Sequence, residues 1–422
     1  MKLVFLIISL YIIPLDFTHS QSGWISQKIG NKQFVDINFI NNSTGFIIGY
    51  DSVILKTTNT GNNWQTIRTN IPATNGGIIC GYFNNENRGM IGSLGGVYRT
   101  SNGGLTWIFS PVPSIGLSAI SMCKFTDSIT GYACGWDAYP FPMISGYDGV
   151  LWKSTDGGNS WFELIRKTGD DFNGFQLNGL DSIKILGQTK IFSSINNGLN
   201  WSEKSILTNP AIYPRSFSNP FNDTIYISGS GGVIKSTDNG NNWFISLQLN
   251  QNNSLWSLAL QNTNKIYSVG NSGQIYFTSN SGNNWINQNS NSNQKLNSVF
   301  FVNKDTGFVV GDSGVILKTF TGGLVNLKKL ESNIPDKIFL YQNYPNPFNP
   351  ETKIRFNIPK SGNIKIIIYN LQGKEIETLL NKKLDIGDYE ISWNGTKYPS
   401  GIYFYRLETG NFVDTKRMIL IK

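Results

Sequence analysis

The sequence predicts an all-β protein: a seven-bladed β-propeller closed by its own N-terminal strand, followed by a small Ig-like β-sandwich. Three observations predict this fold. One short motif recurs six times, mostly at intervals of 40–43 residues. A lone strand-like segment precedes the first copy, and an incomplete repeat follows the last. The composition, with 13% aromatic residues, only 15% charged residues and 44 glycines, is typical of a globular chain of short strands and turns.

The repeated motif places four residue types at fixed offsets from a tryptophan. Ser or Thr stands seven positions before the Trp, Asp or Asn five before it, and Gly three before it. Asp and Asn accept hydrogen bonds from the backbone of their own turn, and Gly supplies a positive φ. A period of about 40–45 residues with four strands is typical of a propeller blade, so we predict a structural turn within each blade. The copies are Thr57-Asn59-Gly61-Trp64, Thr100-Asn102-Gly104-Trp107, Ser154-Asp156-Gly158-Trp161, Ser194-Asn196-Gly198-Trp201, Ser236-Asp238-Gly240-Trp243 and Thr278-Asn280-Gly282-Trp285.

The seventh repeat is incomplete. Residues 296–323 predict three strands, and no Trp-led fourth strand follows them. Residues 23–29 (GWISQKI) have the pattern of a fourth strand with no blade of its own. We therefore predict that the N-terminal strand completes the last blade, which leaves no long sheet edge unpaired. The expected anchors between blades are Trp24, Trp64, Trp107, Trp161, Trp201, Trp243 and Trp285.

The first twenty residues are typical of a secretory signal peptide. Lys2 precedes the apolar run 3–15, and small residues stand at the positions that favour cleavage before Gln21. We expect export through the inner membrane and no integral membrane span in the mature chain. Cleavage removes His19, the only histidine. The mature chain then lacks the imidazole that His-based triads and many zinc sites need, and we expect no metal and no cofactor.

The charge pattern argues against nucleic acid as a partner. Residues 21–327 contain 19 basic and 16 acidic residues, and the basic residues are scattered. A surface that binds nucleic acid normally carries a basic cluster with interleaved aromatic residues. We therefore predict no nucleic-acid partner.

The three cysteines allow two interpretations. Cys123 and Cys134 fall on successive predicted strands, so an exported protein could form a cross-strand disulfide between them. Alternatively, all three, including Cys80, are buried free thiols that pack as small apolar side chains.

One repeat is longer than the others, with 54 residues between Trp107 and Trp161. The excess falls in residues 135–149, between the second and third strands, on the end of a propeller that faces ligands. Aromatic rings and carboxylates on one loop could stack on and hydrogen-bond to a glycan or a protein. Alternatively, the insertion packs on itself and covers apolar surface. The candidate binding residues are Trp136, Asp137, Tyr139, Phe141, Tyr147 and Asp148.

The composition changes after residue 325. We predict a linker over residues 326–337 and a β-sandwich over residues 338–422, with strands around 354–358, 364–369, 389–393, 402–407 and 415–421.

Three segments of this region, YPNPFNP at 344–350, PSGIYFY at 399–405 and KRMILIK at 416–422, resemble the type A sorting domain of the type IX secretion system. The resemblance implies recognition by that machinery, transport across the outer membrane, and release or anchoring at the cell surface. An ordinary carbohydrate-binding sandwich is the alternative. The residues expected to carry the signal are Pro345, Asn346, Pro347, Phe348, Gly401, Lys416 and Arg417.

The repeated motif is similar to the Asp boxes, or bacterial neuraminidase repeats, of sialidase-like propellers. The chain resembles more closely the propellers of the photosystem II stability and assembly factor-like family, which implies binding without catalysis. A sialidase would need three arginines around a carboxylate. Of the five propeller arginines, the strand register places only Arg215 near the central axis, the others being Arg68, Arg88, Arg99 and Arg166.

We therefore predict an exported, non-enzymatic propeller that binds a protein or a glycan. The alternative is a secreted glycoside hydrolase that uses a pair of aspartates. Its candidate residues stand in loops expected on the ligand-facing end, and they are Asp51, Asp137, Asp148, Asp170, Asp171 and Asp312.

Overall fold

The computed structural model describes residues 23–72, 77–139, 147–179, 181–208, 210–221, 223–323, 327–330, 335–396 and 398–422. The predicted signal peptide, residues 1–20, lies outside the described residues. The chain divides into two compact units, one of which spans Ser22–Leu324 and the other of which contains Val325–Lys422. Both are all-β, as predicted. Among the described residues the helices are two 3-10 turns, at Asn271–Gly273 and Asp312–Gly314, and no helix has the length and hydropathy of a membrane span.

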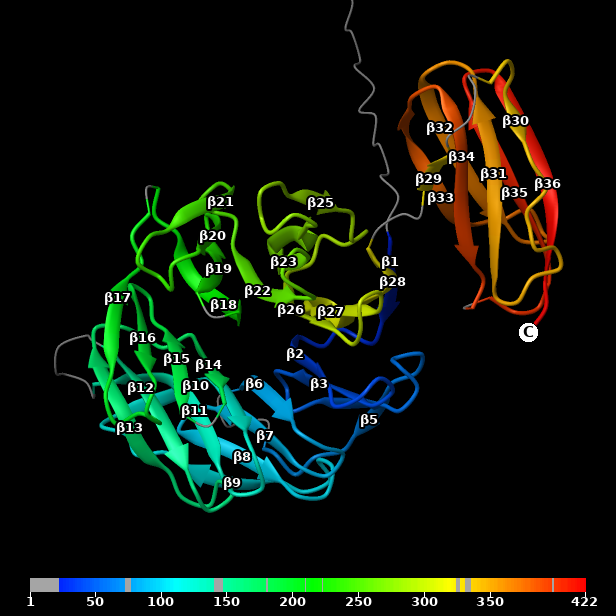
Figure 1. The fold of residues 1–422 in the computed structure, drawn as a ribbon. Helices are drawn as coiled ribbons and strands as arrows, with labels where there is room; N and C mark the ends of the chain where they lie inside the picture. The colour runs from blue at the N-terminus through cyan, green and yellow to red at the C-terminus, as the bar shows by residue number, and fades with distance from the viewer. Residues whose placement is uncertain are drawn as a thin grey trace, which may run out of the picture. The chain divides into compact units, whose positions relative to one another are not determined.

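The first unit is built from four-stranded antiparallel sheets arranged around a common centre (Figure 1). The described part of residues 34–288 forms six sheets, each from four consecutive strands. The first three are β2 (Phe34–Phe39), β3 (Gly45–Gly49), β4 (Ile54–Thr57) and β5 (Gln65–Ile67); β6 (Ile78–Phe83), β7 (Gly89–Ser93), β8 (Gly96–Thr100) and β9 (Ile108–Pro111); and β10 (Leu117–Phe125), β11 (Gly131–Ala138), β12 (Tyr147–Ser154) and β13 (Phe162–Thr168). The next three are β14 (Gly174–Asn178), β15 (Ser182–Leu186), β16 (Lys190–Ser194) and β17 (Ser202–Ser205); β18 (Tyr213–Phe221), β19 (Thr224–Ser230), β20 (Gly232–Ser236) and β21 (Phe244–Gln248); and β22 (Leu255–Leu260), β23 (Ile266–Gly270), β24 (Ile275–Thr278) and β25 (Ile286–Gln288).

A seventh sheet of this unit joins its two ends. It contains β26 (Leu296–Phe301), β27 (Gly307–Gly311), β28 (Val315–Gly323) and β1 (Gly23–Lys28). β1 pairs antiparallel with β28, with Ile25 opposite Lys318. The indole of Trp24 is buried, and its N–H donates to Gln288 Oε1 at 2.8 Å. The N-terminal strand therefore supplies the fourth strand of this sheet.

The seventh sheet packs against the first. Their apolar faces form one core, in which the rings of Phe39 and Phe308 stack with centroids 4.8 Å apart. Asn297 donates to the backbone oxygen of Phe34 at 2.8 Å. The same kind of core lies between other neighbouring sheets, so each sheet buries residues on both of its faces.

The repeated motif forms the same turn in all six copies. The Ser or Thr hydroxyl donates to the Asp or Asn Oδ1 at 2.8–3.0 Å and accepts the N–H of the motif Gly at 2.8–3.0 Å. The same Oδ1 accepts the backbone N–H of the residue before the Trp at 2.9–3.0 Å. The fourth strand begins one residue after the Trp. In the seventh sheet, Thr319 retains part of this turn and accepts the N–H of Gly323 at 2.7 Å.

A basic residue that precedes the motif hydroxyl often reaches the turn of the next sheet. Lys153 donates to Asn197 Oδ1 at 2.9 Å, and Lys235 donates to the backbone oxygen of Ser281 at 3.0 Å. Lys318 of the seventh sheet donates to Asn62 Oδ1 of the first sheet at 2.8 Å. Burial lowers the pKa of Lys318 to about 8. These contacts link sheets side to side.

The second unit packs two four-stranded sheets around one core that includes Ile366, Trp393 and Tyr405. One sheet contains β29 (Leu327–Leu330), β34 (Gly387–Asn394), β31 (Glu351–Ile358) and β30 (Phe339–Leu340), and the other contains β33 (Glu375–Leu384), β32 (Gly362–Tyr369), β35 (Gly401–Thr409) and β36 (Phe412–Leu420). Three strands differ from the sequence-based expectation. β30 and β33 were not expected. β29 falls within the segment expected to be a linker, where it pairs with the edge of β34 and so satisfies backbone groups there.

The cysteines are free and buried. Of the two interpretations, the structure confirms the buried free thiols and not the Cys123–Cys134 disulfide, because the two side chains point to opposite faces of their sheet. Cys123 stands opposite Ala133, while Cys134 stands opposite Met122. Cys123 instead lies against Cys80 of the neighbouring sheet, with Sγ atoms 3.7 Å apart, and the hydrogen bond between them and burial raise the pKa of the Cys123 thiol.

We predict that Trp24→Ala lowers the free energy of unfolding of the first unit by about 3–5 kcal/mol, because it removes a large buried side chain and a buried hydrogen bond. Urea denaturation, monitored by tryptophan fluorescence, measures this loss of unfolding free energy. Lys28→Ala, an exposed position of the same strand, is the matched control and should change stability by less than about 0.5 kcal/mol. Equal stability of the two variants would contradict the joining role of β1.

We predict that the double variant Asp156→Asn/Asp238→Asn loses less stability in acid than the unaltered protein does. Hydrogen bonds to Ser160 lower the pKa of Asp156 to about 2, and hydrogen bonds to Asn242 lower that of Asp238 to about 2. Because these folded-state values lie below the ordinary 3.8, their stabilisation is present above pH 4 and is lost as the pH falls toward 2. Asn occupies this position in the other four copies, so the variant should fold. Denaturant midpoints measured from pH 6 to pH 2 test this; unchanged acid sensitivity would contradict it.

Candidate functional site

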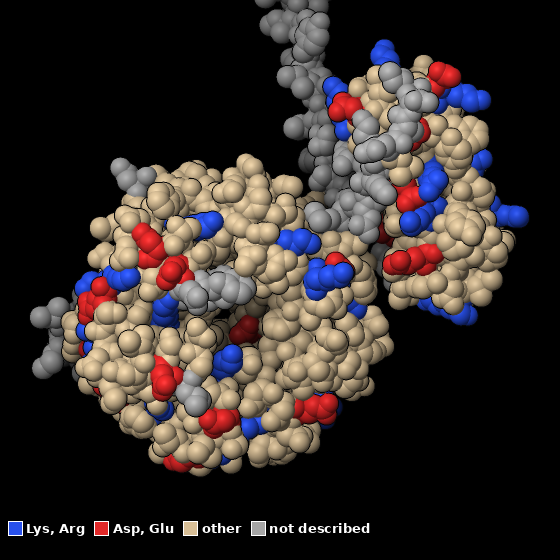
Figure 2. Space-filling model, viewed as in Figure 1, with Lys and Arg blue, Asp and Glu red and all other residues tan. Residues whose placement is uncertain are grey.

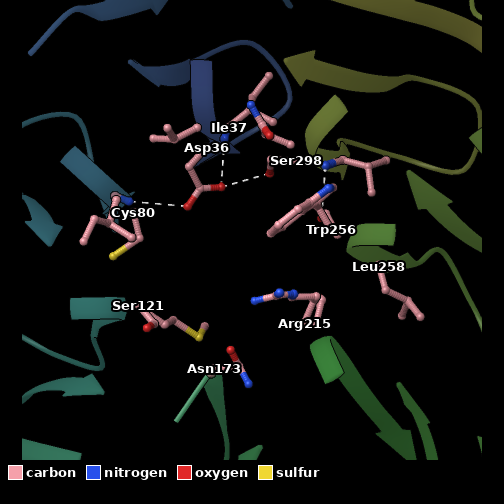
Figure 3. Close-up of a pocket in the computed structure, with 18 of the residues that line it drawn as sticks. Asp36, Ile37, Cys80, Ser121, Asn173, Arg215, Trp256, Leu258 and Ser298 are labelled. Carbon is pink, nitrogen blue, oxygen red and sulfur yellow. Dashed lines mark hydrogen bonds between the residues drawn. The ribbon is translucent and has the colours of Figure 1, made fainter. Parts of the chain in front are cut away.

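The first strands of the seven sheets enclose a central cavity of about 540 Å³. Each of these strands contributes to its wall, and side chains from several sheets point into it (Figure 3). On the face of the first unit seen in Figure 2 the centre is hollowed, and basic and acidic side chains are interspersed around it. A cavity of this volume can enclose a small organic molecule or the end of a larger one.

A repeated β-bulge determines which side chains form the wall. In six of the seven sheets, the ladder between the first and second strands skips one residue near the start of the first strand. A bulge turns the skipped side chain out of the regular alternation, and bulges are common beside functional sites. All six skipped residues line the cavity, and they are Val35, Ile79, Ser121, Arg215, Trp256 and Asn297.

Two cations meet at one indole in this wall. The guanidinium carbon of Arg215 lies 4.8 Å from the ring centroid of Trp256, and Lys295 Nζ lies 3.5 Å from the same centroid. In the described part of the chain, neither cation has a carboxylate within 4.0 Å. Burial lowers the pKa of Lys295, the charge of Asp312 opposes this, and the nearby Arg215 adds to it. Arg215 lies at the centre, as the sequence predicted.

Asp36 also faces this cavity, beside Ser298 of the seventh sheet (Figure 3). Its carboxylate accepts hydrogen bonds from the Ser298 hydroxyl at 2.9 Å, the Ile37 N–H at 2.9 Å and the Gly81 N–H at 3.4 Å. These donors come from three different sheets. Burial raises the pKa of Asp36 to about 6, although the hydrogen bonds oppose the shift. Sequence reasoning missed this residue, because an acidic residue in a short strand gives no sign that it faces a central cavity.

The two carboxylates predicted for ligand binding are engaged inside the protein. Asp137 and Asp148 lie in β11 and β12 rather than in a loop, stand opposite each other, and are buried. Arg166 of β13 bridges them, with Nη2 2.9 Å from Asp137 and Nη1 3.2 Å from Asp148. Asp137 also accepts the Ser114 hydroxyl at 2.6 Å. Hydrogen bonds to Glu163, Asp137 and Asp148 raise the pKa of Arg166.

The aromatic candidates are more exposed. Tyr147 is 54% exposed and Tyr139 is 38% exposed. The rings of Trp136 and Tyr147 meet edge to face, with centroids 5.7 Å apart. The Tyr139 hydroxyl donates to Asp148 at 3.2 Å, so the carboxylate holds the ring in place. Phe141 lies outside the described residues.

The other loop aspartates also have protein partners. Asp170 is buried and accepts the Thr189 hydroxyl at 2.9 Å. Asp171 accepts Gln188 Nε2 at 2.7 Å, and Asp312 accepts Asn297 Nδ2 at 2.9 Å. Asp51 lies 3.5 Å from Lys32 Nζ at the surface. Among the described residues, no group of three or more His, Cys, Asp or Glu side chains is arranged to hold a metal ion.

In the second unit, the residues predicted to form the sorting signal meet along the last strand. Phe348 is buried, and its N–H donates to the backbone oxygen of Ile419 at 3.0 Å. Asn346 Oδ1 accepts the Ile419 N–H at 2.9 Å. Gly401 pairs with Leu420 at the start of β35. Lys416 and Arg417 stand on β36, and the peptide bonds before Pro345 and Pro347 are cis.

Comparison with protein families finds two matches. Residues 18–122 and 248–320 match the family described as photosynthesis system II assembly factor YCF48. Residues 342–422 match the family described as secretion system C-terminal sorting domain. This domain indicates export across the outer membrane, followed by secretion or attachment at the cell surface. No curated protein matches the chain.

Solved structures share the fold at low sequence identity. One described as YCF48 bound to D1 peptide has a TM-score of 0.57 and 15% identity, covering 71% of this chain and 97% of that one. YCF48 from Cyanidioschyzon merolae has a TM-score of 0.53 and 15% identity, covering 70% and 98%. The GH74 enzyme of Niastella koreensis has a TM-score of 0.51 and 14% identity, covering 78% and 58%. These similarities identify the first unit as propeller-like.

We predict that Arg166→Met destabilises the first unit by about 3–5 kcal/mol, because it leaves Asp137 and Asp148 buried without their cation. Thermal and urea denaturation measure the loss. Adding Asp137→Asn and Asp148→Asn to Arg166→Met should restore part of the stability, while Lys167→Met, the neighbouring and more exposed cation, should have little effect. A harmless Arg166→Met would contradict a structural role for the two aspartates.

Proposed function

We propose that the chain is an exported, non-enzymatic β-propeller of seven blades, closed by its N-terminal strand, that binds a protein or a glycan. In this proposal, residues 1–20 direct passage through the inner membrane, and the domain over residues 338–422 is recognised by the type IX secretion machinery. The seven four-stranded sheets and the pairing of β1 with β28 support the closed propeller. The match of residues 342–422 supports the sorting step.

The observation that carries the non-enzymatic proposal is that the six aspartates predicted as glycosidase candidates all have partners within the protein. A glycosidase needs two carboxyl groups that face the sugar, one to donate a proton and one to act as base or nucleophile. Here Asp137 and Asp148 share Arg166 in the interior, and Asp170 is buried against Thr189. Each of the six has a protein partner that uses its carboxylate, the others being Asp51, Asp171 and Asp312.

The aromatic side chains at the end of the β11–β12 hairpin form the proposed contact surface. We define this aromatic surface by Trp136, Tyr139 and Tyr147. Exposed Tyr and Trp present a large apolar area with a polar tip, which suits both protein and glycan partners. The Asp137–Asp148–Arg166 network beneath them holds the hairpin, so these aspartates support the surface rather than contact the ligand. A solved YCF48 structure contains a bound peptide, which supports a protein ligand.

We predict that Trp136→Ala, Tyr139→Ala and Tyr147→Ala together weaken ligand binding at least tenfold, because they remove two exposed tyrosine rings and the half-buried indole that packs against Tyr147. The measurement is pull-down and calorimetry with a ligand selected from glycan arrays and from surface proteins of the source cells. The matched control is Phe162→Ala with Phe244→Ala, two exposed rings outside the hairpin. Unchanged affinity in a folded triple variant would place the ligand surface elsewhere.

A further inference from the structure

The central cavity has two chemically different walls. One wall carries the two cations and the indole, from Arg215 of β18, Trp256 of β22 and Lys295 before β26. The other wall carries apolar groups from the first three sheets, namely Val35, Ile79 and Met122, beside the hydrogen-bonded carboxylate of Asp36. Ile79 is 37% exposed although it lies in the middle of the molecule, so it faces the open cavity.

Neither cation of this wall has an anionic partner within 4.0 Å among the described residues. Among the described residues, the guanidinium of Arg215 makes no hydrogen bond, and neither does Lys295 Nζ. The carboxylates in and near the cavity accept hydrogen bonds from other groups: Asp36 from Ser298, Asp171 from Gln188 and Asp312 from Asn297. Two cations that share one indole repel each other, and a bound anion would relieve that repulsion. Arg presents paired donors that suit a carboxylate in particular.

The bulges show that both walls have the same structural origin. Arg215 and Trp256 are the skipped residues of their sheets, and so are Val35 and Ile79 across the cavity. The same kind of β-bulge therefore turns cationic and aromatic side chains inward on one side of the cavity and aliphatic side chains inward on the other.

We propose that the central cavity is a binding site for a carboxylate attached to an apolar body, with the carboxylate on Arg215 and Lys295 and the apolar body against Val35, Ile79 and Met122. This site is separate from the aromatic surface, and its proposal does not depend on that one. The ligand could be a free organic acid or the C-terminal carboxylate of a peptide that ends in an apolar residue. Both fit a cavity of about 540 Å³, and both present the same chemistry.

The test is calorimetric titration of the mature protein with 3-phenylpropionate, its neutral amide, glucuronate, and a tetrapeptide ending in leucine with a free or an amidated C-terminus. We expect binding of 3-phenylpropionate or of the free-acid peptide, and at least tenfold weaker binding of the matching amides. Binding of the peptide alone would assign the carboxylate to a chain end, and binding of the small acid would assign it to a free metabolite. No binding of either acid, equal binding of acid and amide, or preference for glucuronate would overturn the proposal.

The variants locate the site. Arg215→Gln and Lys295→Gln should each weaken binding of the acid about tenfold or more and make it less dependent on salt. Ile79→Ser should weaken 3-phenylpropionate more than acetate, because it alters only the apolar wall. Arg68→Gln and Lys304→Gln, exposed cations outside the cavity, are the matched controls. The melting temperature of each variant reports folding, and the triple variant of the aromatic surface should bind the acid normally. Unchanged affinity in Arg215→Gln would overturn the proposal.

Discussion

A four-stranded sheet with two apolar faces has to bury both of them, and the architecture of the first unit follows from that need. Each sheet of short strands is too small to be stable alone, because it packs only about twenty residues. It therefore needs a neighbour on each side, including the sheets at the two ends of the chain. The core shared by the first and seventh sheets, and the pairing of β1 with β28, meet this need without a separate capping element.

The repeated turn and the lysines that reach it from the neighbouring sheet both stabilise the packing of one sheet against the next. The motif hydroxyl and Oδ1 accept at least three backbone N–H groups in each turn, so the turn presents a rigid surface to the preceding sheet. Lys153, Lys235 and Lys318 reach that surface from the preceding sheet and bind its oxygens. Since Lys318 binds the turn of the first sheet, the last junction is built like the earlier ones. The geometry repeated in the turns is therefore structural.

Much of this fold could be predicted from the sequence, but little of the site could. The Ser/Thr–Asp/Asn–Gly–Trp spacing located the turns because each residue type has one local role there. The second unit was predicted for a similar reason, although β29, β30 and β33 were missed because pairing between distant strands leaves little local pattern. Arg215 could be placed near the axis by strand register. The β-bulges could not be predicted from the sequence. Because the bulges turn these side chains inward, the close approach of Trp256 and Lys295 to Arg215 could not be predicted either. Asp137 and Asp148 were misplaced because a loop was expected where two strands continue and an arginine from a third strand lies between them.

The central claim is that the exported propeller binds its ligand without chemical change. The most direct test is an array of glycans, polysaccharides and peptides probed with the mature protein, and read both for retained protein and for released sugar. Retention on a defined ligand class with no released product is the expected result. Released sugar that depends on one of the six candidate aspartates would contradict binding without catalysis.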